Sequence, residues 1–301
     1  METIGETLTA ALAKSSMGKP LSERLTQLRQ MSPEDRAKAL VEAEQRKIDR
    51  YNASEGHLND ADGYDCPLCK NRGNIGYLSA SGSCLYPRYP ECKCMDIRRS
   101  ILRMKQSGLE TSIRDYTFQR FEAREPWQNT MLDKAKRYLS EGVTAGQWLF
   151  MGGQPGCGKT HICTAVAGKL LYERPLWYVV WPQVSKKLKA LAMDAEEYER
   201  EIVPLQEVSV LFVDDFFKPT QDDTGRKLMP TPADTRIAFE ILNYRYINKL
   251  PTIISSEWHI AELVDMDEAT GSRIAERASG YCLDIGRDRK RKHRLASSSV
   301  V

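Results

Sequence analysis

Gly153-Gln154-Pro155-Gly156-Cys157-Gly158-Lys159-Thr160 fits the P-loop pattern, in which a glycine and four further residues precede Gly-Lys-Thr. An apolar run of strand length, residues 147–151, comes just before it. Residues 161–171, just after it, contain no proline and space apolar side chains at helical intervals. A strand, a glycine-rich turn and a helix in this order predict an α/β fold with a parallel sheet.

The chemistry expected of this turn is anion binding, because backbone N–H groups of the turn and of the helix N-terminus converge on phosphate. We expect Lys159 to reach the β- and γ-phosphates of ATP and the Thr160 hydroxyl to hold Mg²⁺. The alternative is a glycine-rich turn that binds nothing. An acidic strand end further along the chain favours the nucleotide interpretation.

Two acids, Asp214 and Asp215, follow an apolar run at 208–213 that predicts a buried strand. They come about 55 residues after Lys159. We expect Asp214 to hold Mg²⁺, normally through water, and Asp215 to activate the attacking water. An acidic strand end is weak evidence alone, and its position behind a P-loop is what makes the assignment specific.

Three more apolar runs predict strands at 176–180, 251–257 and 281–285. The run at 251–257 ends in Ser256 and Glu257, and ligands bind at the carboxyl ends of the strands in such sheets. We therefore expect Ser256 and Glu257 to sense the γ-phosphate or the attacking water.

Helical patterns and apolar anchors fill the segments between these strands. Helices are expected at 126–139, 182–204 and 235–248. The aromatic residues Phe118, Phe121 and Trp127 are expected to pack against the nucleotide domain. A short helix beside Arg273 and Arg277 has two interpretations. The arginines form surface salt bridges, or one is an arginine finger that stabilises transition-state charge on a neighbouring subunit's nucleotide.

Five of the eight cysteines lie between Cys66 and Cys94. Cys66 and Cys69 form one closely spaced pair, and Cys92 and Cys94 form another after 22 intervening residues. Four thiolates in two such pairs predict a tetrahedral Zn²⁺ site with a structural role, because no coordination position stays open for chemistry. Cys84 is a spare or alternative ligand and His57 a weaker substitute. The other interpretation is a cluster of reduced, buried cysteines.

The ends of the chain are charged. Ser32-Pro33-Glu34-Asp35 predicts a helix start, and the helix is expected to run to about Arg50, with either a solvated or a partner-docking face. The tail at 287–294 is strongly basic and either contacts phosphates or keeps the chain soluble. We predict a helical segment at 1–60, a zinc module at 61–105, the ATPase domain at 106–286 and a basic disordered tail at 287–301.

Composition is that of an ordinary soluble protein, with 41% hydrophobic and 28% charged residues and a net charge of +3. The chain contains no apolar run of membrane-spanning length, and its start lacks a charged-then-apolar signal pattern. We expect a cytoplasmic protein with no membrane partner.

These motifs together resemble the DnaC/DnaI family of replicative-helicase loaders, particularly its phage and Firmicute-type members. The resemblance runs from about residue 64 to residue 285 and is carried by six stretches. They are DCPLC…CKC, SGLETSIRDYTFQRF, WLFMGGQPGCGKTHICTA, VLFVDDFFKPT, PTPADTRIAFEILNYRYINKLPTIISSE and GSRIAER.

The resemblance implies an AAA+ domain, with that superfamily's sheet order, that assembles side by side so that nucleotide lies between subunits. Residues 153–160 match Walker A, and Asp214-Asp215 match Walker B. The segment around Ser256 and Glu257 matches sensor 1. Arg273 matches the trans-acting finger, with Arg277 close to the nucleotide. Lys186, Lys187 and Lys189 fall in the helical insertion that lines the DNA path in initiator-type relatives.

The implied function is ATP-dependent loading of the hexameric replicative helicase onto single-stranded DNA, with the helical segment at 1–60 implied to bind the helicase. Lys159, Asp215, Ser256 and Arg273 would be catalytic. Asp215 stands where many AAA+ proteins carry glutamate, and Glu257 where many loaders carry asparagine, so turnover is expected to be slow or to depend on assembly. Alternatives are an IstB-like transposition regulator that assembles on duplex DNA, and a nucleotide-gated adaptor that hardly hydrolyses ATP. A P-loop kinase fits less well, since no substrate lid is evident.

Overall fold

The computed structural model describes residues 30–81, 84–106, 109–220, 223 and 227–286. The chain divides into two compact units, residues 1–95 and 96–301. The expectations for the first 29 residues and for the basic tail lie outside the described residues. The finer domain boundaries stay predictions.

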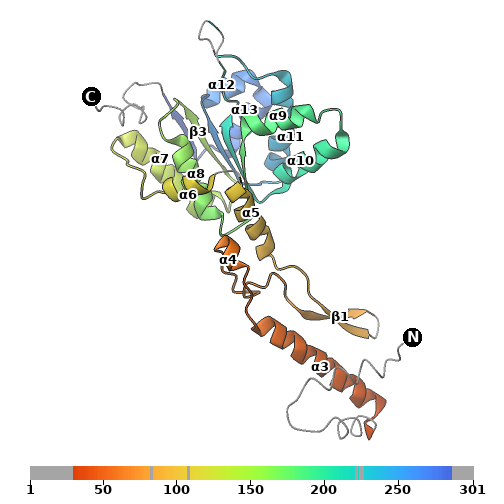
Figure 1. Cartoon of the computed structure of the whole chain (residues 1–301). Coiled ribbons are helices and arrows are strands. Elements are labelled where there is room, and N and C mark those ends of the chain that lie inside the picture. The colour runs from red at the N-terminus through yellow and green to blue at the C-terminus, as the bar shows by residue number, and fades with distance from the viewer. Residues whose placement is uncertain (1–29, 82–83, 107–108, 221–222, 224–226, 287–301) are drawn as a thin grey trace. The chain divides into compact units, whose positions relative to one another are not determined.

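The described part of the first unit, from residue 30 on, contains two helices and a β-hairpin (Figure 1). Helix α3 (Pro33–Ala53) begins as predicted, with the Ser32 hydroxyl accepting the Asp35 N–H at 3.1 Å, and it ends beyond the predicted Arg50. Helix α4 spans Asn59–Asp62. Strands β1 (Tyr77–Ser81) and β2 (Cys84–Arg88) pair antiparallel. The sequence analysis did not predict this hairpin.

The second unit is built on a five-stranded parallel sheet. Its strands are β3 (Trp148–Gly153), β4 (Leu176–Val180), β5 (Val210–Phe216), β6 (Thr252–Ser256) and β7 (Cys282–Ile285). The order across the sheet is β4-β5-β6-β3-β7. Five predicted apolar runs thus become five strands, and the predicted α/β class is confirmed. The order is the AAA+ order that the resemblance implies.

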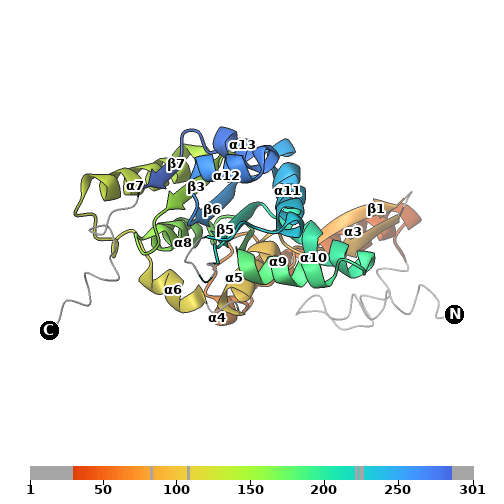
Figure 2. The same ribbon diagram turned by 90° about the horizontal axis from the view of Figure 1, so that it is seen from above.

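Helices cover both faces of the sheet. Those of the second unit are α5 (Cys94–Gln106, which begins at the boundary between the units), α6 (Leu109–Asp115), α7 (Pro126–Arg137) with the π-helix η1 (Tyr138–Gly142), α8 (Lys159–Leu170), α9 (Trp181–Ala190), α10 (Ala195–Glu207), α11 (Pro232–Ile247), α12 (Ile260–Met266) and α13 (Glu268–Arg277). Figure 2 shows α8 on one side of β3, β5 and β6 and the pair α12–α13 on the other. No helix of the described chain is long and apolar enough to cross a membrane.

The helix predicted at 182–204 is two helices, α9 and α10. Asp194 begins the second one, because its side chain accepts the Glu197 N–H at 3.1 Å. An aspartate in this position is a strong helix start. The sequence analysis did not predict this break, because the charged residues on both sides of Asp194 are common in helices.

The hydrophobic core of the second unit is explained by the alternation of side chains along each strand. Successive side chains of a strand point to opposite faces. One set of alternate residues, which includes Phe150, Val213 and Ile254, packs with α9 to α13 in a single apolar cluster. Their sequence neighbours Leu149, Phe212 and Ile253 are equally buried. A sheet that is apolar on both faces is fixed in register, so the polar residues at its carboxyl ends are held in place.

Arg245 of α11 is fully buried at the amino ends of the strands. Its guanidinium donates to the Thr252 hydroxyl at 2.9 Å and to four carbonyl oxygens, those of Leu205, Gln206, Val208 and Pro251. Burial lowers the pKa of Arg245 to about 9, which leaves it charged at neutral pH. The carbonyl dipoles satisfy the buried charge, and they join the end of α10 to the starts of β5 and β6.

Candidate functional site

The P-loop connects β3 to α8 and depends on its glycines. Gly153 and Gly158 have φ values of 96° and 97°, a region that side chains rarely adopt. A Cβ at Gly153 would lie 2.2 Å from the Ile285 carbonyl oxygen, and one at Gly158 would lie 2.9 Å from the Phe121 ring. No side-chain hydrogen bond caps α8 in the described structure. Its first-turn N–H groups therefore stay available to a phosphate.

Lys159 is buried, and its Nζ donates to the carbonyl oxygens of Gly153 at 2.8 Å and Gln154 at 2.7 Å. The Cys157 thiol donates to the same Gln154 oxygen at 2.9 Å. Burial raises the pKa of Cys157, so the thiol stays neutral. The loop thus holds its own lysine, and Pro155 and Gly156 line the cleft beside it.

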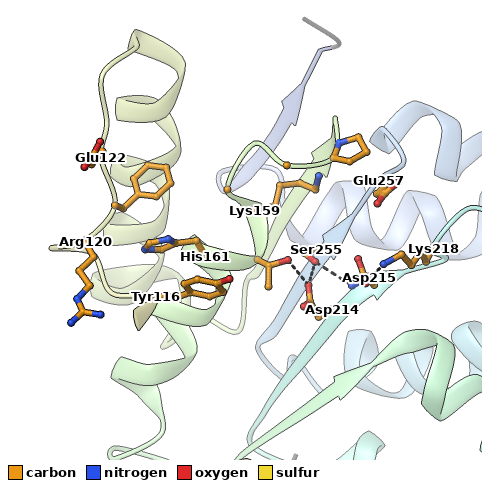
Figure 3. A pocket seen from close by; sticks show the side chains of 15 residues that line it. Tyr116, Arg120, Glu122, Lys159, His161, Asp214, Asp215, Lys218, Ser255 and Glu257 are labelled. Atoms are coloured by element: carbon orange, nitrogen blue, oxygen red, sulfur yellow. Dashed lines mark hydrogen bonds and ion pairs between the residues drawn. The ribbon is translucent and has the colours of Figure 1, made fainter. Parts of the chain in front are cut away.

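Asp214 lies near the end of β5 at the centre of a polar cluster (Figure 3). Thr160 Oγ1 donates to its Oδ1 at 3.1 Å, and the Ser255 hydroxyl donates to the same oxygen. Tyr178 donates to Oδ2 at 3.3 Å. Burial raises the pKa of Asp214, while the hydrogen bonds from Ser255 and Thr160 oppose that shift. A hydroxyl and a carboxylate that meet in this way form an oxygen donor set that fits Mg²⁺.

Asp215 has a left-handed backbone with φ of 53°. Its N–H donates to Ser255 Oγ at 3.2 Å, and the β5–β6 register shifts between Val213 and Phe216. This irregularity lets two consecutive acids reach the same cleft, although alternation would send them to opposite faces. The Asp215 carboxylate accepts an ion pair from Lys218 Nζ at 2.7 Å.

A cleft of about 530 Å³ is lined by the P-loop residues Lys159 and Thr160, by Asp214 and Asp215, and by Lys218 and Ser255. Opposite the acids its wall is aromatic: the Tyr116 ring stacks on His161 with centroids 4.8 Å apart, and Phe121 meets His161 edge-on at 5.2 Å. His161 is further fixed by a 2.9 Å contact with the Thr117 carbonyl oxygen. The sequence analysis expected only packing from Phe121 and overlooked Tyr116 and His161. Two aromatic residues in the segment ahead of α7, Tyr116 and Phe121, were the available signal.

Ser256 does not line the cleft. Its hydroxyl donates to the Phe216 carbonyl oxygen at 2.8 Å and accepts the Trp258 N–H at 3.1 Å. The neighbouring Ser255 contacts Asp214 and Asp215 instead. The expectation for Ser256 is therefore corrected to Ser255, one residue earlier on β6. Glu257 does line the cleft, as expected of a residue at this strand end.

Arg273 and Arg277 lie on α13, and neither lines the cleft of its own chain. Arg273 donates to Asn243 Oδ1 at 3.0 Å and to the Ala269 carbonyl oxygen at 2.6 Å. Arg277 donates to the Tyr246 carbonyl oxygen at 2.7 Å. The structure thus separates both arginines from the P-loop of the same chain.

The three lysines expected to meet DNA lie on α9 and are exposed. Two of them pair with acids, Lys187 with Glu201 at 2.7 Å and Lys189 with Asp234 at 2.8 Å. The hydrogen bond from Lys189 helps to lower the pKa of Asp234 to about 2, against the opposing effect of burial. Lys186 shares the exposed side of the helix.

The four predicted zinc ligands lie together in the first unit. The sulfurs of Cys66, Cys69, Cys92 and Cys94 all lie within 4.8 Å of one another, and the four residues are buried. Cys66 and Cys92 Sγ are 3.8 Å apart, and Cys69 and Cys94 Sγ are 3.5 Å apart. Tetrahedral zinc with Zn–S bonds of about 2.3 Å needs sulfurs about 3.8 Å apart. The cluster fits zinc, and the side chain of Cys84 lies outside the described residues.

The thiols differ in acidity. Burial raises the pKa of Cys69, but the Gly73 N–H and the neighbouring thiols outweigh that effect and lower it to about 7. The Gly73 N–H lies 3.3 Å from the sulfur, in a turn where Lys70 and Asn71 also have left-handed backbones. Burial raises the pKa of Cys92. A backbone N–H that points at a buried sulfur stabilises the thiolate form that a metal binds.

Known proteins show where this chain belongs. No family model matches it. The phage-like element PBSX protein XkdC of Bacillus subtilis (strain 168) is 31% identical over 244 residues, which cover 79% of this chain and 88% of the relative. The chain belongs to the XkdC family. A second relative of this XkdC-family protein is the uncharacterized protein YqaM of the same organism, 37% identical over 146 residues, with 48% of this chain and 44% of YqaM covered.

Two solved structures have similar chain paths. The crystal structure of DnaI is 22% identical with a TM-score of 0.46, over 58% of this XkdC-family chain and 93% of DnaI. The crystal structure of the DnaC helicase loader is 16% identical with a TM-score of 0.47, over 58% and 98% of the two chains. These scores are too low to support conclusions about activity or partners.

Proposed function

We propose that this XkdC-family protein is an ATPase that loads a hexameric replicative helicase onto single-stranded DNA in the cytoplasm. The observation that carries the ATPase part is one cleft that brings together Lys159, Thr160, Asp214 and Asp215 from two distant stretches of chain. A cation, a hydroxyl and two carboxylates beside a helix N-terminus suit a magnesium nucleotide.

Each residue then has a distinct role. Lys159 exchanges the loop carbonyls for the β- and γ-phosphates, and the α8 N–H groups bind the same phosphates. Thr160 and Asp214 would hold Mg²⁺, which neutralises phosphate charge when bound. Asp215 orients the attacking water, and Ser255 fixes the position of Asp215 through its backbone N–H. The aromatic wall of Tyr116 and Phe121 faces the space left for the nucleobase.

The cysteine cluster suits a structural zinc. Four buried sulfurs leave no open coordination position, so the metal would support the fold of a unit that has a small apolar core. We propose that this unit, which includes helix α3, contacts the helicase. The support is the sequence resemblance of the DCPLC…CKC stretch to the loader family. Lys187 and Lys189 are ion-paired with acids of the same chain. Of the three lysines on α9, Lys186 is therefore the one that we expect to contact DNA.

Replacement of Arg273 by alanine is expected to keep ATP affinity within about twofold and to lower assembly-dependent hydrolysis by about 10³-fold, because a trans-acting arginine finger contributes on that order. The measurement is ATP turnover against protein concentration, with ATP affinity measured in parallel. Asn243→Ala is the matched control, since it removes the hydrogen bond that joins Arg273 to α11 and keeps the arginine itself and its bond to the Ala269 carbonyl oxygen. Equal losses in the two variants would show that Arg273 serves to hold α13 on α11.

The loader function is tested by helicase capture. The full chain is immobilised and offered the replicative helicase of its host with ATP or with ADP, with single-stranded or duplex DNA. We expect capture of the helicase, and transfer to single-stranded DNA only with ATP. ATP-dependent filaments on duplex DNA without helicase binding would instead support the IstB-like alternative. Helicase capture without measurable turnover would support the nucleotide-gated adaptor.

A further inference from the structure

Lys218 lines the nucleotide cleft and has no role in the mechanism proposed above. It comes three residues after Asp215, and its Nζ lies 2.7 Å from Asp215 Oδ2 (Figure 3). It lines the cleft together with Lys159 and Glu257. Its ammonium therefore lies on the carboxylate that we expect to orient the attacking water, on the side of the cleft away from the aromatic wall.

The described lining residues include two other basic side chains. Lys159 belongs to the P-loop, where its Nζ donates to two loop carbonyls, and Arg120 is ion-paired with Asp115 on the side of the aromatic wall (Figure 3). Lys218 faces three carboxylates, those of Asp215, Glu257 and Asp214. The Asp215 hydrogen bond and the charges of all three raise its pKa, against the opposing effect of partial burial. The site therefore keeps a charged ammonium beside its acids.

The Lys218–Asp215 pair is half exposed, with 48% of the lysine and 29% of the aspartate side chain accessible. Exposed ion pairs contribute little net stability, so a stronger anion can replace the carboxylate at small cost. A terminal phosphate carries more charge than a carboxylate and accepts charge-assisted hydrogen bonds from a lysine. Such a group enters the cleft between Thr160 and Asp215 only when ATP, and not ADP, is bound.

We propose that Lys218 binds the terminal phosphate of ATP and thereby distinguishes ATP from ADP. In the nucleotide-free chain its ammonium rests on Asp215, and its transfer to the phosphate releases that carboxylate to accept water. The proposal rests on the proposed function, since it requires that the cleft binds nucleotide. It assigns two lysines to the triphosphate, one from the P-loop and one from the segment after β5.

The test is a comparison of affinities for ADP and for a non-hydrolysable ATP analogue, measured on the full chain by isothermal titration. Lys218→Met keeps the apolar stem and removes the charge. We expect its affinity for the ATP analogue to fall by about tenfold, which corresponds to the loss of one charge-assisted contact. Affinity for ADP should stay within about twofold, and it also reports that the variant is folded. Lys218→Arg should recover most of the lost affinity.

Lys227→Met is the matched control, because Lys227 donates to the Glu257 carbonyl oxygen at 3.0 Å but does not line the cleft. It should leave both affinities unchanged. Equal weakening of ADP and ATP-analogue binding in Lys218→Met, or no weakening, would overturn the proposal. Faster hydrolysis with unchanged analogue affinity would also overturn it and show that Lys218 acts as a brake. Failure of the unmodified chain to bind either nucleotide would refute the proposed function instead.

Discussion

Replacement of Lys159 by alanine is expected to abolish nucleotide binding. The side chain is buried, and its ammonium is the cation nearest the P-loop carbonyls. The substitution removes at least two charge-assisted contacts to phosphate, each of about 1.5–3 kcal/mol. It also removes the lysine donor from the Gly153 and Gln154 oxygens, of which the Gln154 oxygen keeps the Cys157 thiol. Affinity for ATP should therefore fall by more than about 100-fold, measured by titration with a fluorescent ATP analogue.

Lys169→Ala is the matched control, because Lys169 is an exposed lysine on the same helix α8. It should bind the analogue as the unmodified chain does. Thermal unfolding of Lys159→Ala in the absence of nucleotide separates loss of binding from loss of fold. Tight ATP binding by Lys159→Ala would refute the assignment of the P-loop.

The second large effect is expected from Cys66→Ser. A hydroxyl is a poor substitute for a thiolate, and a structural zinc site with three sulfurs no longer closes a tetrahedron. Metal analysis should show that zinc falls from about one ion per chain to none. The loss should also make the first unit sensitive to proteases, because metal binding supplies folding free energy in small modules of this kind.

Two further cysteine variants sharpen this result. Cys282→Ser changes a thiol of the second unit, outside the cluster, and should keep the full zinc content. Cys84→Ser tests the alternative ligand that the sequence leaves open, and full zinc content there would restrict the site to the four clustered cysteines. Unchanged zinc in Cys66→Ser would contradict the zinc assignment.

Most of the sheet and the nucleotide residues could be predicted because their signals are local. A P-loop encodes a strand, a turn and a helix within a few residues, and each buried strand is a short apolar run. Each cysteine pair is an equally local signal, and two such pairs at this separation are typical of a zinc site. Lys159, Thr160, Asp214 and Asp215 meet in one cleft as expected.

The features that the sequence analysis missed or placed wrongly depend on tertiary structure. Ser255 and Ser256 are neighbours on β6, and their side chains point to opposite faces of the sheet. The sequence does not determine which of the two faces the cleft, because the pairing of β6 with β5 is irregular at this strand end. Tyr116 meets His161 only because the segment ahead of α7 lies against α8. The hairpin sequence at 77–88 contains alanine, glycine and proline, which are depleted in strands, so composition argued against it.

The cation at Arg245 has a consequence for motion in the second unit. It connects the starts of β5 and β6 to the end of α10 through five hydrogen bonds, all at the edge of the sheet opposite the cleft. Five hydrogen bonds hold that edge, so we expect it to move less than the carboxyl ends of the strands and the segment after β5. If the cleft binds nucleotide as proposed, we expect the resulting movement to be a rotation about the Arg245 end of the sheet and not a sliding of strands.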